Sequence, residues 1–293
     1  MKVLNISKKE FNKLQQLQLD GNIFNSECTL YILKDMFNKK YAFKKLYNDS
    51  GFRFSNKLFT LNELIDNSSK INIDDLVMPK RLVAIDNKVS GFIMPYINGI
   101  NFQTVLDSDN YLHKDKIEYL KQIGIILEQM KKVRETTDIK EFYLNDMHEN
   151  NFVLDKQTNT IKVVDMDSCK INGNYTFPSR YLSIFSNISN FPKYEKEKEC
   201  DCGGYYKPSE NTDLYCYIIM ILNYISDARV NNLTMENFWG YLLYLRNIGI
   251  SYELLDKIAL IYSNEENINI YEYLDELCYF EGKTSYKKYT KSK

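Results

Sequence analysis

The sequence has few of the residues that mark disordered or metal-stabilised chains. It contains 11 Gly and 5 Pro among 293 residues, too few for a collagen-like chain or a Pro/Gly-rich disordered one. It has only two histidines, His113 and His148, so the neighbouring Cys200 and Cys202 lack the further ligands that a zinc site needs. We therefore expect an ordered globular protein without a zinc site.

An excess of charge of one sign is also missing. The 38 basic and 39 acidic side chains give a net charge of −1, which excludes a strongly basic nucleic-acid-binding protein. The longest apolar stretch, residues 214–225, is shorter than the roughly 20 residues of a membrane-spanning helix, and the first residues contain no apolar signal core. We expect an unexported, cytoplasmic protein with reduced cysteines, which binds neither nucleic acid nor membranes.

The pattern of apolar residues divides the chain into two parts. Runs of β-prone residues and one amphipathic helix dominate up to about residue 97, and helical periodicity dominates beyond residue 99. No long Pro/Gly/Ser-rich linker separates the two parts, so we expect a short hinge. The expected strands are 29–33, 41–46, 81–85, 89–94, 152–154 and 162–164, and the expected helices are 56–66, 115–133, 213–225, 235–247, 252–262 and 270–279.

Three polar residues near the middle of the chain have the chemistry of phosphoryl transfer. Asp146 and Asn151 precede the expected strand 152–154, and Asp165 follows the expected strand 162–164. Transfer from ATP needs a carboxylate near the acceptor hydroxyl, and it needs oxygen ligands for the Mg²⁺ that neutralises the phosphates. Because Asp and Asn are also common in turns, this triplet needs support from elsewhere in the chain.

The order and spacing of Asp146, Asn151 and Asp165 resemble the catalytic loop and metal-binding segment of the protein-kinase-like superfamily. Upstream, Lys44 ends the run Y-A-F-K, which resembles the V-A-I-K strand of that family, and Glu63 follows in the expected helix. The resemblance implies that Lys44 orients the phosphates of ATP and that Glu63 holds Lys44. Asp146 would then position the acceptor hydroxyl, while Asn151 and Asp165 would bind Mg²⁺.

The segment after the last N-terminal strand looks like the hinge that binds adenine in this family. The backbone carbonyl of Pro95 and the N–H of Ile97 would bind adenine, and Met94 would lie beside the pocket behind it. The phosphate-covering loop is normally rich in glycine, because backbone N–H groups must approach the phosphates there. Gly21 is the only glycine at that place here.

Other positions depart from the family pattern. Asn145 replaces the arginine that precedes the catalytic aspartate, so we do not expect control by phosphorylation of the activation segment. Asp167 replaces the glycine of D-F-G and gives a D-x-D-S motif, which resembles a group of atypical bacterial Ser/Thr kinase-like proteins. Asp167 could reach a second metal, although a simple helix-side or turn role is the plainer interpretation. Asp213 resembles a buried aspartate that braces the catalytic loop, but it could equally cap its own helix.

The resemblance implies an α+β fold with two lobes, as in protein kinases. A small β-rich N-lobe with one helix would span residues 1–95, and residues 96–99 would form the hinge. A larger, mainly helical C-lobe would span 100–281, and a Lys-rich tail would follow at 282–293.

The implied function is an ATP-dependent phosphotransferase that moves the γ-phosphate of Mg-ATP to a hydroxyl. A Ser/Thr protein kinase with a protein substrate is the favoured form. Two alternatives stay open. His148 is the residue type found at that place in aminoglycoside and choline kinase-like enzymes, which favours a small-molecule acceptor. The glycine-poor phosphate loop favours a nucleotide-binding pseudokinase that acts as an interaction module.

Overall fold

The structure is a computed structural model that describes residues 3–17, 28–35, 37–47, 50–174, 207–230, 233, 235–280 and 284–286. The chain forms two compact units. The first consists of Met1–Thr104, Val133–Phe142 and Asn150–Thr176, and the second of Val105–Lys132, Tyr143–Glu149 and Phe177–Lys293. The first unit thus combines the N-terminal part of the chain with a later segment that carries Asn151 and Asp165.

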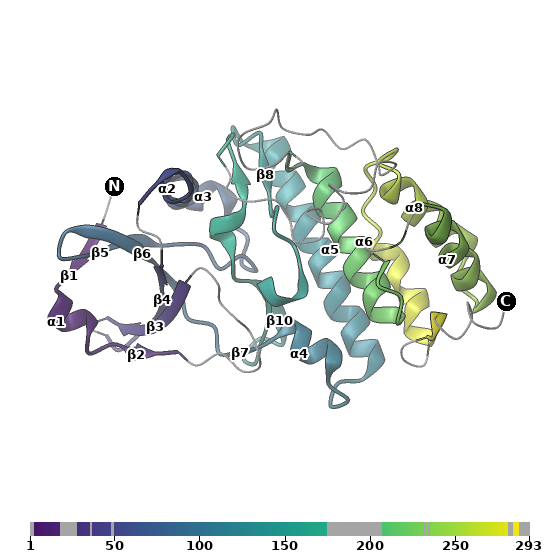
Figure 1. The fold of residues 1–293 in the computed structure, drawn as a ribbon, viewed down its shortest axis with the longest axis horizontal. Helices are drawn as coiled ribbons and strands as arrows, with labels where there is room; N and C mark the ends of the chain where they lie inside the picture. The colour runs from purple at the N-terminus through teal and green to yellow at the C-terminus, as the bar shows by residue number, and fades with distance from the viewer. Residues whose placement is uncertain are drawn as a thin grey trace. The chain divides into compact units, whose positions relative to one another are not determined.

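A six-stranded sheet is the centre of the first unit (Figure 1), with the strand order β1-β5-β6-β4-β3-β2. Pairing is antiparallel except between β1 and β5, which are parallel. Four of these strands confirm the expected ranges to within a residue or two. The strands are β1 (Val3–Ile6), β2 (Gln15–Gln16), β3 (Cys28–Lys34), β4 (Lys40–Leu46), β5 (Arg81–Ile85) and β6 (Lys88–Pro95).

Polar residues close the two hairpins of this sheet. Between β3 and β4, the Asp35 carboxylate accepts hydrogen bonds of 2.9 Å from the backbone N–H groups of Phe37 and Lys39. Between β5 and β6, Asp86 and Asn87 have φ values of 47° and 69°, which these two residue types tolerate better than most. Local turn chemistry therefore fixes the register of the central strands.

Two helices accompany the sheet, α2 (Phe52–Asp66) and α3 (Ser68–Ile71). Leu61 of α2 is fully buried and packs with Ala42, Phe92 and Met94 from the sheet. The helix starts four residues before the expected Asn56 and ends where expected. A second, three-stranded sheet has the order β10-β9-β7, with strands β7 (Gly99–Asn101), β9 (Phe152–Asp155) and β10 (Thr160–Val163).

The N-terminal strand β1 and the short helix α1 (Lys8–Phe11) are additions to the expected outline. The helix has a capping box, in which the Glu10 N–H donates to the Ser7 hydroxyl and the Ser7 N–H donates to the Glu10 carboxylate. The S-x-x-E spacing is a sequence signal for such a box, so α1 could have been predicted from the sequence. Strand β1 could not be predicted from a local signal, because its partner β5 lies about 80 positions away in the sequence.

The later part of the chain is mainly helical, as expected. Helix α6 is buried on all sides over most of its length, as befits a helix that is apolar all round. Residues 271–279 form a 3₁₀ helix where an α-helix was expected. No helix in the described residues is long and apolar enough to cross a membrane. These elements, with the remaining short ones, are α4 (Phe102–Asp107), α5 (His113–Thr136), β8 (Phe142–Tyr143), η1 (Glu149–Asn151), η2 (Met166–Ser168), β11 (Lys170–Ile171), α6 (Glu210–Ile225), α7 (Met235–Asn247), α8 (Tyr252–Tyr262) and η5 (Tyr271–Tyr279).

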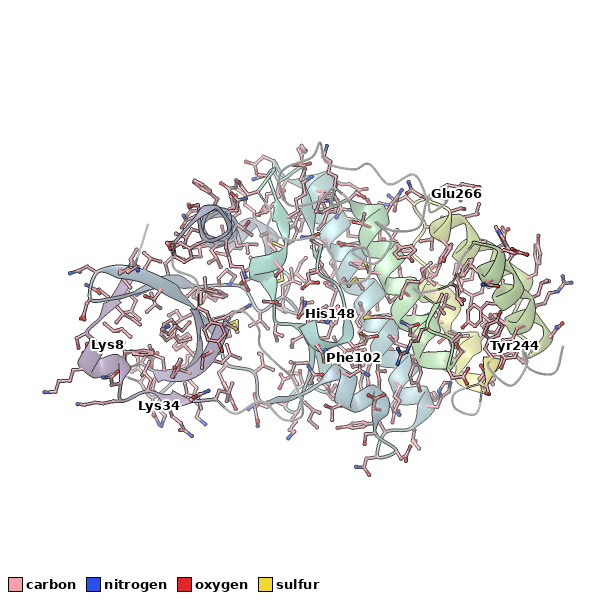
Figure 2. All side chains as sticks on the ribbon, viewed as in Figure 1. Lys8, Lys34, Phe102, His148, Tyr244 and Glu266 are labelled. Carbon is pink, nitrogen blue, oxygen red and sulfur yellow. The ribbon has the colours of Figure 1, made fainter. Side chains whose placement is uncertain are left out.

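Tyrosines supply much of the interior of the second unit. The Phe238 ring of α7 stacks on the Tyr262 ring of α8 with 3.4 Å between centroids. Tyr241 of α7 donates to or accepts from the Ser226 hydroxyl at 2.8 Å, and Tyr244, labelled in Figure 2, lies against Tyr241. Burial raises the pKa of Tyr241 and of Tyr262. These phenols therefore stay neutral and can pack as apolar rings.

Gly124, inside α5, gives a test of this packing. The phenol of Tyr217 on α6 approaches it and donates a 2.8 Å hydrogen bond to the Leu120 carbonyl. A Cβ on residue 124 would lie 2.6 Å from the Tyr217 hydroxyl oxygen and 2.4 Å from the Tyr271 Cβ. Gly124→Ala should therefore lower the free energy of unfolding by about 1–3 kcal/mol, although alanine favours an isolated helix by about 1 kcal/mol. Urea unfolding of both proteins checks the sign, and a stabilised variant would contradict the close approach.

Candidate functional site

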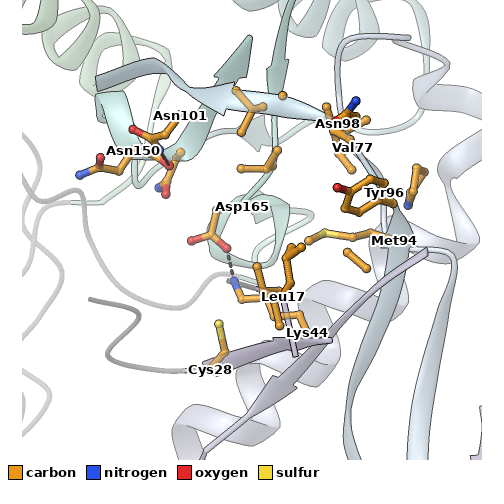
Figure 3. Close-up of a pocket in the computed structure, with 18 of the residues that line it drawn as sticks. Leu17, Cys28, Lys44, Val77, Met94, Tyr96, Asn98, Asn101, Asn150 and Asp165 are labelled. Carbon is orange, nitrogen blue, oxygen red and sulfur yellow. Dashed lines mark hydrogen bonds and ion pairs between the residues drawn. The ribbon is translucent and has the colours of Figure 1, made fainter. Parts of the chain in front are cut away.

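A cavity of about 260 Å³ lies in the first unit, close to the lower end of the roughly 300–1,000 Å³ that is usual for small-molecule pockets. Figure 3 shows Lys44 and Asp165 in contact with each other at its wall. Its lining contains most of the residues expected to bind nucleotide: Lys44, Met94, Pro95, Ile97, Asn151 and Asp165. Residues from both ends of this unit therefore meet at one cavity.

The walls of the cavity are mainly apolar. Ala42, Val77 and Met94 line it and also belong to the buried cluster that includes Leu61 of α2. Val153 of β9 and Val164, just after β10, add apolar surface from the later segment. The faces of a flat aromatic ring suit such an apolar lining.

Lys44 owes its position to the centre of the sheet. Its strand, β4, lies between β3 and β6, where Lys44 pairs with Leu30 and Phe92. The side chain is 9% exposed and its ammonium lies over the Phe92 ring at 5.9 Å. A lysine is rarely buried to this degree unless it is paired, and Lys44 has two carboxylate partners.

Those partners are the two aspartates of the D-x-D motif. The Lys44 Nζ donates to Asp165 Oδ1, the contact drawn in Figure 3, and to Asp167 Oδ1 at 2.7 Å. Asp165 is 24% exposed at the cavity wall, whereas the Asp167 side chain is fully buried. Lys57 of α2 binds the other oxygen of Asp167, with Nζ 2.9 Å from Oδ2. The pairing of Asp167 with two lysines was not part of either interpretation considered above.

The ion pair expected between Lys44 and Glu63 is not formed. Glu63 Oε2 accepts hydrogen bonds from Asn172 Nδ2 at 2.9 Å and from Asn67 Nδ2 at 3.3 Å. Lys57 and Glu63 are six residues apart in α2, so their side chains lie about 120° apart around the helix axis. Because Lys57 is on the face that meets Asp167, Glu63 lies on a different face. Helix α2 therefore contributes a lysine, and not a glutamate, to the cluster of Lys44, Lys57, Asp165 and Asp167.

Burial and mutual charge set the ionisation of the cluster. Burial, and then the charge of Asp167, raise the pKa of Asp165 to about 6. Burial opposes the ionisation of Asp167, but the ammonium groups of Lys44 and Lys57 outweigh it and hold its pKa well below the usual range. Burial likewise opposes the charge on Lys44, yet the two carboxylates raise its pKa well above normal. The Lys44 ammonium therefore stays charged at neutral pH.

Cys28, the first residue of β3, also lines the cavity and was not expected there. Burial raises the pKa of its thiol to about 11, so it is neutral at physiological pH and packs as a small apolar side chain. The expected strand began one residue later, at Thr29, and gave no sign of this contact.

The segment expected to be the hinge follows β6 and lies within the first unit. Tyr96, Ile97 and Asn98 line the cavity, and the Asn98 carbonyl accepts a 3.0 Å hydrogen bond from the Lys156 N–H. At Gly99 the chain comes so close to β9 that a Cβ would lie 2.2 Å from Val153 Cγ1. Within the described part of the chain, the Ile97 N–H donates to no other residue. This group is thus available to a ligand, as the expected hinge register requires.

Replacing Ile97 with proline tests that register. Proline removes the N–H but keeps an apolar side chain, so ATP affinity should fall about fivefold, equivalent to roughly 1 kcal/mol for one hydrogen bond. Ile97→Val retains the N–H and should bind ATP within twofold of the parent. Calorimetric titration of both variants checks this, and equal affinities would mean that adenine uses a different donor.

Asn151 and Asp165 both line the cavity, and both side chains carry oxygen atoms. The backbone carbonyl of Asn151 accepts a 3.0 Å hydrogen bond from the Val164 N–H, and the neighbouring Asn150 carbonyl accepts one of 3.1 Å from Asn101 Nδ2. Amide and carboxylate oxygens are ligands that suit Mg²⁺. In the described residues no group of three or more His, Cys, Asp or Glu side chains could hold a metal on its own. A metal here would thus also depend on ligand phosphates.

The second unit holds Asp146 on a braced loop. Asp213, in the first turn of α6, is 3% exposed and accepts hydrogen bonds from the backbone N–H groups of Leu144 at 2.7 Å and Asn145 at 2.9 Å. Asn145 has a φ of 64°, a left-handed conformation that asparagine tolerates. The bracing interpretation of Asp213 is therefore confirmed, and Ser209 provides the cap of α6 instead.

Asp146 follows this braced pair directly. Its Oδ2 lies 3.6 Å from Nε2 of His148, so the two residues singled out from the sequence are neighbours within this loop. Its role toward an acceptor hydroxyl stays a prediction. Gly21, Cys200 and Cys202 lie outside the described residues. The same is true of most of the expected activation segment, residues 168–206, and of most of the Lys-rich tail.

Comparison with known proteins bears on the fold. No protein-family model and no curated protein matches this sequence, whereas 1879 chains of solved structures match the structure. One of these is the pseudokinase DRIK1 (drought responsive inactive kinase 1), in a co-crystal with ENMD-2076. The match has a TM-score of 0.54 at 10% sequence identity and covers 95% of this chain and 98% of that chain. The chain therefore has a two-lobed, protein-kinase-like fold, with an N-terminal β-sheet and helix followed by a mostly helical part.

Proposed function

We propose that this chain binds ATP in the cavity described above and transfers the γ-phosphate to a hydroxyl. The acceptor that we favour is a serine or threonine of a protein. The observation that carries the proposal is that Lys44, Asn151 and Asp165 line one cavity. A cation for phosphates and oxygen ligands for a metal are thus brought together from distant parts of the sequence. Kinase-like enzymes require this combination for phosphoryl transfer.

The cavity supports binding of the adenine end as well. Ala42 and Val153 provide apolar surface for the purine, and the Ile97 N–H is available as a donor. The Lys44 ammonium would bind the phosphates through charge-assisted hydrogen bonds, which are stronger than neutral ones. Because Lys44 is already charged and buried, little side-chain entropy is lost when it binds phosphate.

Asn151 and Asp165 are the residues that would hold Mg²⁺. Their oxygen atoms fit that ion, and the described residues offer no competing set of soft ligands at the cavity. When bound, the ion would neutralise phosphate charge. Asp165 would meanwhile exchange its contact with Lys44 for a contact with the metal, which requires the Asp165 carboxylate to be ionised.

Asp146 is the proposed residue for positioning the acceptor hydroxyl. The bracing of its loop by Asp213 supports this role, because a catalytic carboxylate must be held in a fixed place. A small-molecule acceptor is the alternative that His148 favours, since its Nε2 lies 3.6 Å from the Asp146 carboxylate and could influence which acceptors fit.

A nucleotide-binding module without turnover is the second candidate function. It is favoured by the pairing of Lys44 with both aspartates rather than with Glu63, an arrangement that differs from the one active kinases use. The name of the matching structure, an inactive kinase, agrees with this alternative but describes that protein and not this one.

Radiolabelled ATP separates these possibilities. Purified protein is incubated with γ-labelled ATP and Mg²⁺ alone, with host lysate protein, and with a protein-free extract of small molecules. Label on protein supports the protein kinase, and label only on a small molecule supports the alternative acceptor. ATP binding by calorimetry without transfer in any arm supports the module. If ATP does not bind at all, the proposal fails.

A further inference from the structure

The two carboxylates of the D-x-D motif differ in exposure and partners. Asp165 lines the cavity with Lys44, whereas neither Asp167 nor Lys57 is part of its described lining. Asp167 is fully buried and has one lysine on each carboxylate oxygen. We propose that Asp167, held by Lys57 of α2, is the positioning residue that keeps Lys44 in place for the nucleotide phosphates, the role expected of Glu63. This inference rests on the proposed function.

The geometry gives Asp167 two simultaneous contacts. Lys44 Nζ lies 2.7 Å from Oδ1, and Lys57 Nζ lies 2.9 Å from Oδ2. The carboxylate therefore bridges a strand at the centre of the sheet and the helix that packs against η2. A lysine held in this way keeps its direction even when its other partner, Asp165, is withdrawn.

Withdrawal of Asp165 is what nucleotide binding would require. Asp165 is the partner at the cavity wall and one of the two proposed metal ligands, so a bound metal would compete with Lys44 for its carboxylate. Asp167 lies outside the lining and can stay on Lys44 throughout. Lys44 would thus exchange its contact with Asp165 for a contact with phosphate, and it would keep its contact with Asp167.

The charge of Lys57 is part of the same arrangement. Lys44 and Lys57 balance Asp165 and Asp167, so these four side chains carry no net charge beside the phosphate end of the cavity. Without Lys57 they would carry one negative charge, which would repel phosphate at short range in a site of low dielectric constant. Lys57 therefore favours phosphate binding without itself reaching the cavity.

The test compares ATP with adenosine, which fills the same cavity but has no phosphates. Calorimetric titration with each ligand is run on the parent and on Lys57→Met, Lys57→Arg, Glu63→Gln and the double variant Lys57→Met/Asp167→Asn. Lys70→Met is the matched control, since it removes a lysine that is 44% exposed and paired with Asp138. Thermal unfolding of every variant reports whether the fold is retained.

We expect Lys57→Met to weaken ATP binding about tenfold and to leave adenosine binding within twofold. Lys57→Arg, Glu63→Gln and Lys70→Met should bind ATP within threefold of the parent. The double variant is the decisive one, because it restores the charge balance but removes the permanent partner of Lys44. It should lose at least tenfold in ATP affinity with adenosine unchanged.

Three results would overturn the inference: parallel losses of ATP and adenosine in the Lys57 variants, normal ATP affinity in the double variant, or a tenfold loss in Glu63→Gln. A parent protein that binds neither ligand would overturn the proposed function itself, and this inference with it. That outcome is distinct, because it is visible before any variant is made.

Discussion

Lys44→Met is expected to lower kcat/KM for phosphoryl transfer at least 100-fold. The change removes the charged group that would contact the phosphates in the transition state, and a 100-fold loss corresponds to about 2.7 kcal/mol. Steady-state transfer with labelled ATP measures it. Retained activity would mean that Lys44 serves the fold alone and that another cation binds the phosphates.

Two further variants make that result interpretable. Lys45 is the next residue of β4, and its ammonium lies near the Phe11 ring, 6.0 Å from the centroid, because successive side chains of a strand point to opposite faces. Lys45→Met should leave kcat/KM within threefold. Lys44→Arg keeps the charge that the buried aspartates need, so it separates loss of catalysis from loss of folding, which Lys44→Met could cause through unpaired carboxylates.

Asp213→Ala is expected to lower the free energy of unfolding by about 2–4 kcal/mol. The substitution leaves the backbone N–H groups of Leu144 and Asn145 without their acceptor in a buried place, and an unsatisfied buried donor costs about 1–3 kcal/mol. It also removes a carboxylate from the first turn of α6, where the helix dipole favours negative charge. Urea unfolding followed by circular dichroism measures the change.

Ser209→Ala is the matched comparison for Asp213. It removes the cap of the same helix and should cost about 1 kcal/mol. Asp213→Asn keeps one acceptor oxygen and should fall between the two. If Asp213→Ala costs less than Ser209→Ala, the loop before Asp146 is not braced in the way the hydrogen bonds indicate.

Sequence patterns predicted the parts of this structure that depend on local chemistry. The two strands on either side of Asp35, the second of which carries Lys44, follow from β-propensity, and both lie where expected. The resemblance assigned Lys44 and Asp165 to one nucleotide site, which spacing alone could not do, but it did not predict that the two side chains pair directly.

The partner of Lys44 could not be predicted in the same way. Lys57 and Glu63 both lie on α2, and the choice between them depends on how far the helix is rotated about its axis. The leucines of α2 do not determine that rotation closely, because Leu58, Leu61 and Leu64 form a broad apolar stripe. The structure supplies the missing information, because it buries Asp167, and a buried carboxylate needs cations nearby.

Asp213 shows a second kind of limit. An aspartate at the start of a helix can cap its own backbone or bind a distant one, and both interpretations have the same local sequence. Only the position of Leu144 and Asn145, almost 70 residues earlier, distinguishes them.

The double use of the cavity walls has a consequence for how such a pocket can evolve. Ala42, Val77 and Met94 line the cavity and at the same time belong to the core that holds α2 against the sheet. A substitution that admits a bulkier ligand, or that confers resistance to an inhibitor, therefore also alters core packing. Substitutions that change the ligand specificity of this pocket should therefore be tolerated only in a protein that is more stable than its function requires. We expect stabilising substitutions far from the site to precede them.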